Sequence, residues 1–192
     1  TAKSVCRNAR ELRAQVRYII QAYDEPALVE EFIEGRELTM GLLGNAPWHL
    51  APRADESRKT NGNGRVRNGL KAMRETLRVL PPLEVDLSPV PAEEGGVYTS
   101  VVKGKLYEVP KYLCPAPVSK AMRAQLDKLS VAAFNALECF DFARIDFRID
   151  QKTGAPLILE VNPLAGLQEG ISDIVMAAEA DGNARRCQVA FR

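Results

Sequence analysis

The sequence has little of what several common kinds of functional site require. Its 192 residues contain a single histidine, His49, and four scattered cysteines, Cys6, Cys114, Cys139 and Cys187, without a C-x-x-C pair. A zinc site and a Cys–His nucleophile are therefore weak candidates, and His49 is best explained as a structural residue. The isolated thiols favour free cysteines in a reducing cytoplasm over a disulfide framework.

Long apolar runs and a strong net charge are missing too. No stretch is long enough to span a bilayer, and no secretory signal pattern is present. The formal net charge is only +1, which predicts neither nucleic acid nor a membrane as partner. With 46% hydrophobic and 27% charged residues, the composition is that of a globular protein able to bury a core in one domain.

What the sequence does contain is a pair of adjoining β-like stretches, 142–150 and 157–162. Both alternate with a period of two, and the residues between them, 151–156, have the composition of a turn, so we expect a β-hairpin. If the hairpin is symmetric about Thr153, Asp146 lies opposite Glu160 and Arg144 opposite Asn162. The same alternation predicts that Ile158 shares a face with Glu160 and Asn162.

These side chains bear directly on chemistry. Like charges across a ladder are destabilising unless a positive group compensates them, and an acid within the apolar run 157–161 is costly if buried without a partner. Oxygen ligands from Asp146, Glu160 and Asn162 on one surface suit Mg²⁺. The competing explanation is a solvated face of weak ion pairs, which the alternation of Arg and Asp from Arg144 to Asp150 also fits.

The rest of the chain predicts an α+β fold with an antiparallel sheet and packed helices. Apolar spacing indicates helices over 4–23, from an N-cap at Ser119 to near Phe140, and from an N-cap at Ser172 to Ala180. Strands are expected at 27–33 and 36–43, short β-like pieces at 97–102 and 105–109, and an extended connector at 111–117.

Residues 52–96 differ from the rest of the chain in composition: they include many basic residues, an Asn-Gly-Asn-Gly run and a proline-rich tail. We expect a flexible, solvated excursion here, within a single domain that spans 1–192. A nucleic-acid patch is the alternative, but interleaved aromatic residues are missing. A third explanation, that these basic residues bind substrate phosphates, ranks between the other two.

Four motifs, in order, resemble the C-terminal half of ATP-grasp ligases, and among these the D-alanine–D-alanine ligases. They are Val29-Glu-Glu-Phe-Ile-Glu-Gly-Arg-Glu37, Lys111-Tyr-Leu-Cys-Pro-Ala116, Ala143-Arg-Ile-Asp146 and Leu159-Glu-Val-Asn162. The resemblance covers nearly the whole chain except the basic stretch. It departs from the family's usual pattern at Pro163 and Ala165, which bears on amino-acid specificity more than on the metal site.

The resemblance implies a role for each matching residue. The nucleotide would contact Glu30, the backbone of Glu31 to Ile33, the side chain of Phe32, Glu37 at the ribose, Leu159, and Lys103 at the phosphates. Two Mg²⁺ ions, or Mn²⁺ in their place, would bind Asp146, Glu160 and Asn162. Arg144 and the amide of Gly166 would stabilise an oxyanion, and Ser172 would hold the carboxylate of the attacking amino acid.

The expected activity is that of a cytoplasmic, ATP-dependent carboxylate–amine ligase that joins two D-amino acids for peptidoglycan synthesis through an acyl phosphate. Its partners would be small amino acids, and the resemblance allows a homodimer. A ligase with another carboxylate and amine, or a non-catalytic nucleotide-binding module, are the alternatives. We further expect the glycine-rich phosphate loop and an N-terminal domain upstream of Thr1, so that the chain alone turns over poorly.

Overall fold

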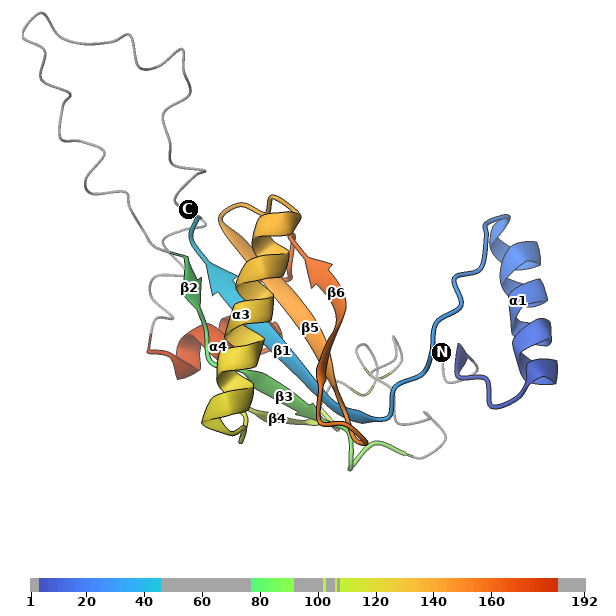
Figure 1. Ribbon diagram of the computed structural model, residues 1–192, viewed down its shortest axis with the longest axis horizontal. Coiled ribbons are helices and arrows are strands. Elements are labelled where there is room, and N and C mark those ends of the chain that lie inside the picture. The colour runs from blue at the N-terminus through green and yellow to red at the C-terminus, as the bar shows by residue number, and fades with distance from the viewer. Residues whose placement is uncertain (1–3, 46–76, 92–101, 103–105, 107, 183–192) are drawn as a thin grey trace, which may run out of the picture.

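The computed structural model describes residues 4–45, 77–91, 102, 106 and 108–182. Its centre is a six-stranded antiparallel sheet in the order β4-β3-β1-β5-β6, with β2 also paired to β1 (Figure 1). The strands are β1 (Gly35–Leu43), β2 (Arg78–Val79), β3 (Leu83–Asp86), β4 (Lys111–Leu113), β5 (Phe142–Asp150) and β6 (Pro156–Asn162). The helices are α1 (Ala9–Tyr23), α3 (Lys120–Ala136) and α4 (Asp173–Ala180). The α+β class is confirmed.

The main hydrophobic core lies between α3 and one face of the sheet. Alternate residues of β1 and β5 point to this face, and Leu126 and Phe134 of α3 meet them there. The strand residues in this cluster are Leu38, Met40, Leu42, Ala143, Ile145, Phe147 and Ile149, all buried. Because a strand alternates its side chains, Glu37 and Thr39 of β1 and Arg144, Asp146 and Arg148 of β5 are directed to the opposite face.

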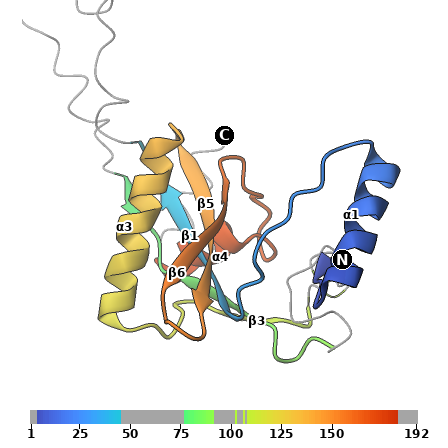
Figure 2. The same cartoon turned by 45° about the vertical axis from the view of Figure 1, so that its right-hand side comes forward.

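Helix α4 covers part of that opposite face, as Figure 2 shows with α3 and α4 on different sides of the sheet. Its apolar residues Ile174, Ala177 and Ala178 form a second cluster with Leu80 and Ala165. Gly41 permits this close packing: a Cβ there would lie 2.9 Å from the Cγ1 of Ile174 and 2.7 Å from the Cδ1 of Leu80. The first turn of α4 is thereby held beside β1 and β5.

Several predicted boundaries need correction. The first helix begins at Ala9, after an N-cap at Asn8, rather than at Ser4, and α3 ends at Ala136 rather than near Phe140. No strand forms at 27–33, although the segment includes apolar residues such as Val29. Leu28 and Val29 are exposed, and the segment has no ladder partner among the residues that the structure describes. The expected connector at 111–117 begins with a strand, β4, paired with β3.

The expected flexible excursion at 52–96 is wrong for 77–91. This part contributes β2 and β3, and β3 is an interior strand between β1 and β4. Leu80, Leu83 and Val85 are buried. The two prolines that suggested a loop, Pro81 and Pro82, come immediately before β3, where a missing N–H does not interrupt the ladder.

Helix α1 differs from the other helices because none of its residues is buried. It lies apart from the sheet, at the end of the segment 24–34 (Figure 1). In the part of the chain that the structure describes, no helix is long and apolar enough to cross a membrane.

Some predictions lie outside the described residues: Lys103, His49, Cys187, residues 52–76 and most of 97–102. Val102 itself is helical and buried, contrary to the strand expected there. The described members of 105–109 form bends and turns rather than a strand.

Candidate functional site

The hairpin of β5 and β6 has the predicted pairing at its polar end. Asp146 lies opposite Glu160, and Arg144 lies opposite Asn162. On its other side β5 pairs with β1, which places Thr39 opposite Asp146 and Gly41 opposite Arg144. Residues paired across a ladder point to the same face, so these side chains form one polar surface on the face that α4 partly covers.

The predicted pairing is wrong between the turn and Asp146, because β6 contains a β-bulge. The register shifts after Asp146, so that Phe147 pairs with Ile158 and Leu159 has no partner on β5. Ile158 therefore shares the face of Phe147, not that of Glu160 and Asn162. Strand β6 is also the edge of the sheet, and Leu157, Ile158 and Leu159 are each 39–48% exposed, so the expected buried apolar run around Glu160 does not exist.

Asp146, Glu160 and Asn162 nevertheless converge. The amide nitrogen of Asn162 lies 3.1 Å from Oδ2 of Asp146 and 3.2 Å from Oε1 of Glu160, so one point in space is within reach of both carboxylates. No three His, Cys, Asp or Glu side chains gather as a metal site among the described residues. A cation here would take two carboxylates and at most one amide oxygen, which leaves further positions for water or phosphate. This donor set fits Mg²⁺.

Arg144 supplies the positive charge that the facing carboxylates require. Its Nε and Nη2 donate to the two oxygens of Asp146, both at 2.9 Å, and Nη2 lies 3.8 Å from Oε1 of Glu160. Thr39 donates its hydroxyl to Oδ1 of Asp146. Asp146 is only 8% exposed, and burial alone would raise its pKa. The bonds and charge of Arg144 outweigh burial and hold the pKa of Asp146 below its ordinary value of 3.8.

This lowered pKa predicts a pH-dependent contribution to stability. Ionised Asp146 stabilises the folded chain above the unfolded pKa of 3.8, and the contribution is lost as the pH falls through the lower folded pKa. We expect wild type to exceed Asp146→Asn in free energy of unfolding at about pH 6, with the difference shrinking by about pH 3. Urea titrations in the presence of EDTA measure both values. A difference that is the same at both pH values would contradict the prediction.

The loop 163–172 and the start of α4 complete the surface next to Arg144. Asp173 is the first residue of α4 and is 7% exposed. Its Oδ2 lies 3.4 Å from Nη1 of Arg144. Ser172 is at the N-cap as predicted, but its hydroxyl accepts from the backbone N–H of Gln168 at 2.8 Å instead of capping the helix. A Cβ on Gly166 would lie 3.1 Å from that hydroxyl. The structure therefore brings Arg144, Gly166 and Ser172 into one region.

Sequence reasoning missed Asp173. An acid in the first turn of a helix is usually explained by the helix dipole, and nothing in its local pattern distinguished this one. The available signal was the neighbouring Ser172, to which the family resemblance gives a substrate role.

Glu37 lies on the same face, further along β1. Arg148 is its cross-strand partner, and Nη2 of Arg148 lies 3.0 Å from Oε2 of Glu37. A cavity of about 590 Å³ lies at this end of the sheet, and its lining includes Gly35, Glu37, Asp86, Arg148 and Gln151. Glu37 is thus placed at an open cavity, although its carboxylate already has a cationic partner.

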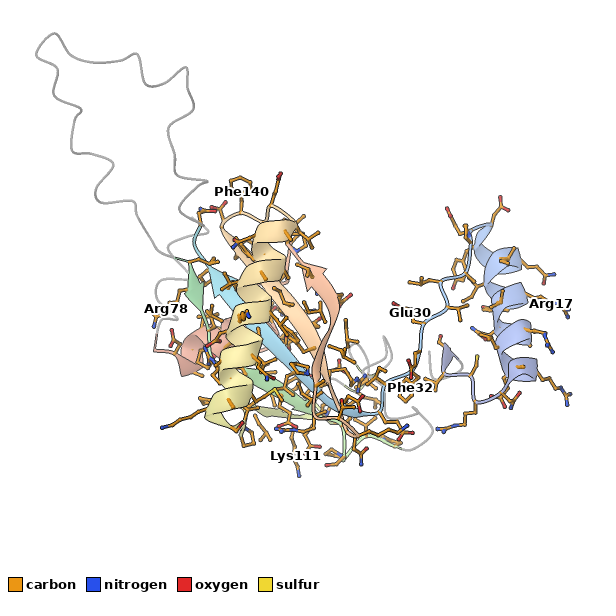
Figure 3. All side chains as sticks on the ribbon, viewed as in Figure 1. Arg17, Glu30, Phe32, Arg78, Lys111 and Phe140 are labelled. Atoms are coloured by element: carbon orange, nitrogen blue, oxygen red, sulfur yellow. The ribbon has the colours of Figure 1, made fainter. Side chains whose placement is uncertain are left out.

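The other predicted nucleotide residues that the structure describes are not gathered at this surface. Glu30, Glu31 and Phe32 are exposed and Ile33 is half-buried, all on the segment between α1 and β1. Figure 3 shows Phe32 closer to the sheet than Glu30. Leu159 is exposed at the bulge on the edge strand. Lys103 lies outside the described residues.

Thiol chemistry is disfavoured at the described cysteines near the sheet. Burial raises the pKa of Cys114 to about 11, and burial also raises the pKa of Cys139. A thiol with a raised pKa forms little thiolate at neutral pH, so neither is a good nucleophile.

Comparison with known proteins gives a consistent result. The sequence profile of the family described as "D-ala D-ala ligase C-terminus" matches residues 75–186. The D-alanine–D-alanine ligase of Janthinobacterium sp. (strain Marseille) is 31% identical over 84% of this chain and 39% of its own length. An uncharacterized protein of Sinorhizobium fredii, y4sG, is 31% identical over 90% of this chain and 41% of its own length. The chain spans about two fifths of the length of these relatives.

Solved structures show a similar fold. The D-alanine–D-alanine ligase of Coxiella burnetii matches with a TM-score of 0.61 at 19% identity, over 96% of this chain and 40% of that one. The D-alanine–D-alanine ligase of Bacillus anthracis complexed with ATP matches with a TM-score of 0.60 at 17% identity, over 95% of this chain and 46% of that one.

Proposed function

Because this chain belongs to the D-alanine–D-alanine ligase C-terminal family, we propose that it forms the nucleotide- and metal-binding part of an ATP-dependent carboxylate–amine ligase. The reaction would be of the D-alanyl-D-alanine type: ATP phosphorylates the carboxylate of a D-amino acid, and an amine then attacks the acyl phosphate. Ligation of two D-amino acids for peptidoglycan synthesis is the form of this reaction that the relatives suggest.

One observation carries the proposal. Asp146, Glu160 and Asn162 come together on one face of the hairpin, with an arginine beside them. Phosphoryl transfer needs positioned charge rather than covalent chemistry from the protein, and a carboxylate pair next to a guanidinium can provide it. Bound Mg²⁺, as one or two ions, would neutralise phosphate charge at Asp146, Glu160 and Asn162.

The other residues have roles that follow from their positions. Arg144 is held by Asp146 in a fixed orientation, so it can stabilise negative charge that develops on the former carbonyl oxygen, together with the backbone amide of Gly166. Glu37 would meet the ribose at the open cavity. Glu30 to Ile33, Leu159 and Lys103 are proposed to complete the nucleotide site, and Ser172 to contact the amine substrate.

A second candidate keeps the same reaction but uses a different amine. Pro163 and Ala165 depart from the family's usual loop, and Asp173 adds a carboxylate beside Arg144. A non-catalytic nucleotide-binding module remains the alternative from another class.

Equilibrium binding and product formation test the proposal. The purified protein should bind ATP in the presence of Mg²⁺ by calorimetry, and EDTA should weaken the binding. In a protein that also includes the upstream segment expected for this family, added D-alanine should give phosphate release together with a new dipeptide detected by mass spectrometry. ATP binding without any ligated product, for donor amino acids with and without added amines, would support the non-catalytic module instead.

A further inference from the structure

Arg148 is a buried cation at the proposed ribose end of the site, and the proposed reaction gives it no role. It is 6% exposed and lies on β5, opposite Glu37 of β1. Both residues line the cavity of about 590 Å³. An arginine that has lost most of its contact with water needs neighbours that balance its charge and satisfy its donors.

The guanidinium of Arg148 contacts two points of β1. Nη2 lies 3.0 Å from Oε2 of Glu37, and Nη1 donates to the backbone carbonyl of Gly35 at 3.2 Å. A guanidinium is planar and fixes the directions of its donors. Two contacts from one such group therefore hold the carboxylate of Glu37 in a defined position relative to the backbone at the start of β1.

Gly35 connects this arrangement to the segment proposed to complete the nucleotide site. Its φ is +156°, and a Cβ there would lie 1.8 Å from the carbonyl oxygen of Ile149, so only glycine fits. The preceding carbonyl, that of Glu34, accepts from the N–H of Gln151 at 2.8 Å. The chain is thus fixed against β5 and its turn directly after residues 30–33.

A carboxylate held in this way is a suitable receptor for a sugar. Its two oxygens together offer about four acceptor sites, so Glu37 can accept from Arg148 and from ribose hydroxyls at the same time. Ordering a long side chain on binding costs conformational entropy. Because the contacts of Arg148 order Glu37 before the nucleotide arrives, the receptor is preorganised and that cost on binding is smaller.

We infer that Arg148 is a positioning residue of the nucleotide site, which acts through Glu37 to make binding depend on the ribose hydroxyls. The inference rests on the proposed function, in which Glu37 meets the ribose. Without Arg148, the carboxylate of Glu37 loses its bonded cation and can turn toward solvent in the open cavity. Binding would then no longer distinguish ribose from deoxyribose.

The test compares ATP with 2′-deoxy-ATP and 3′-deoxy-ATP, which each lack one ribose hydroxyl. Calorimetry with Mg²⁺ and without amino acid, in a protein that also includes the upstream segment expected for this family, gives the three dissociation constants. We expect wild type to bind ATP about tenfold or more tightly than at least one analogue. Arg148→Met should bring that ratio close to one, and Arg148→Gln provides a second variant if the first does not fold. Arg148→Lys, which keeps the charge, should retain more of the ratio than either.

Two further variants separate positioning from other effects. If Arg148 acts through Glu37, adding Arg148→Met to Glu37→Gln should leave the ratio of the Glu37→Gln protein unchanged. The matched control is Arg123→Met, because Arg123 also contacts a carboxylate and a backbone carbonyl, those of Asp127 and Val79, but lies on α3. It removes a comparable structural contact away from the cavity, so the wild-type ratio should persist.

The ratio of dissociation constants does not respond to a merely structural role, because partial unfolding weakens the apparent binding of all three nucleotides equally. Equal affinities in wild type, a ratio that the Arg148 variants do not lower, or a further fall in the Glu37→Gln background would each overturn the inference while ATP binding still supports the proposed nucleotide site. Failure of wild type to bind ATP would contradict the proposed function and the inference together.

Discussion

Replacing Asp146 with Asn, in a protein that includes the upstream segment expected for this family, should lower ATP-dependent product formation by about 10³-fold or more. Asp146 is the most buried of the three proposed metal ligands, and it also fixes the guanidinium of Arg144 through two bonds. The substitution therefore removes a charged ligand and loosens the proposed oxyanion donor in one step. Each of these contributions is large in phosphoryl- and acyl-transfer sites.

Phosphate release and product mass measure this loss, and calorimetry shows whether ATP still binds. Glu160→Gln should reduce turnover in the same direction. Asp127→Asn is the control, because Asp127 forms an ion pair with Arg123 on α3, on the other face of the sheet. Turnover of Asp146→Asn within tenfold of wild type would exclude the proposed metal site.

Replacing Phe147 with Ala should cost about 3–5 kcal/mol of unfolding free energy. Phe147 is fully buried between α3 and the sheet, where it contributes to the main core. Its neighbours on β5 are ordered by a nine-residue ladder with β1, so the backbone cannot close the resulting cavity. The loss is a large fraction of the stability of an ordinary domain.

Urea unfolding followed by circular dichroism gives the free energy for each variant. Phe140→Ala is the matched control, since Phe140 is 55% exposed and lies just before the same strand (Figure 3). It should change stability by less than about 1 kcal/mol. Equal losses in the two variants would mean that the core does not lie where α3 meets β5.

The hairpin could be predicted because strand periodicity and a short turn fix it locally. The pair Asp146 and Glu160 is as the symmetry about Thr153 predicts, but the ladder beside the turn is offset from that symmetry by one residue, with Phe147 opposite Ile158, and the bulge at Leu159 restores the predicted pair. The exposure of Leu157 to Leu159 could not be predicted in this way. Whether a strand lies inside a sheet or at its edge depends on partners far away in the sequence, and an apolar run is compatible with both.

The errors elsewhere have the same origin. Residues 27–33 have strand-like side chains but no partner strand among the described residues, whereas the four residues of β3 are too few to show a period and gain their strand conformation from β1 and β4. Local propensity was outweighed by tertiary pairing in both places. Asp173 was missed because its place at the candidate site comes from contact with Arg144, 29 positions earlier.

The unpaired residue Leu159 determines which side chains of β6 point to each face of the sheet. Counted outward from the turn, an uninterrupted strand would direct Glu160 toward α3 and Leu159 toward Asp146. The one extra residue reverses that order for everything that follows it, so the acid reaches the polar face only because the strand contains a defect. An odd number of residues inserted or deleted between the turn and Glu160 would therefore turn Glu160 away from Asp146 and remove the candidate metal site, whereas an even number would keep both on one face.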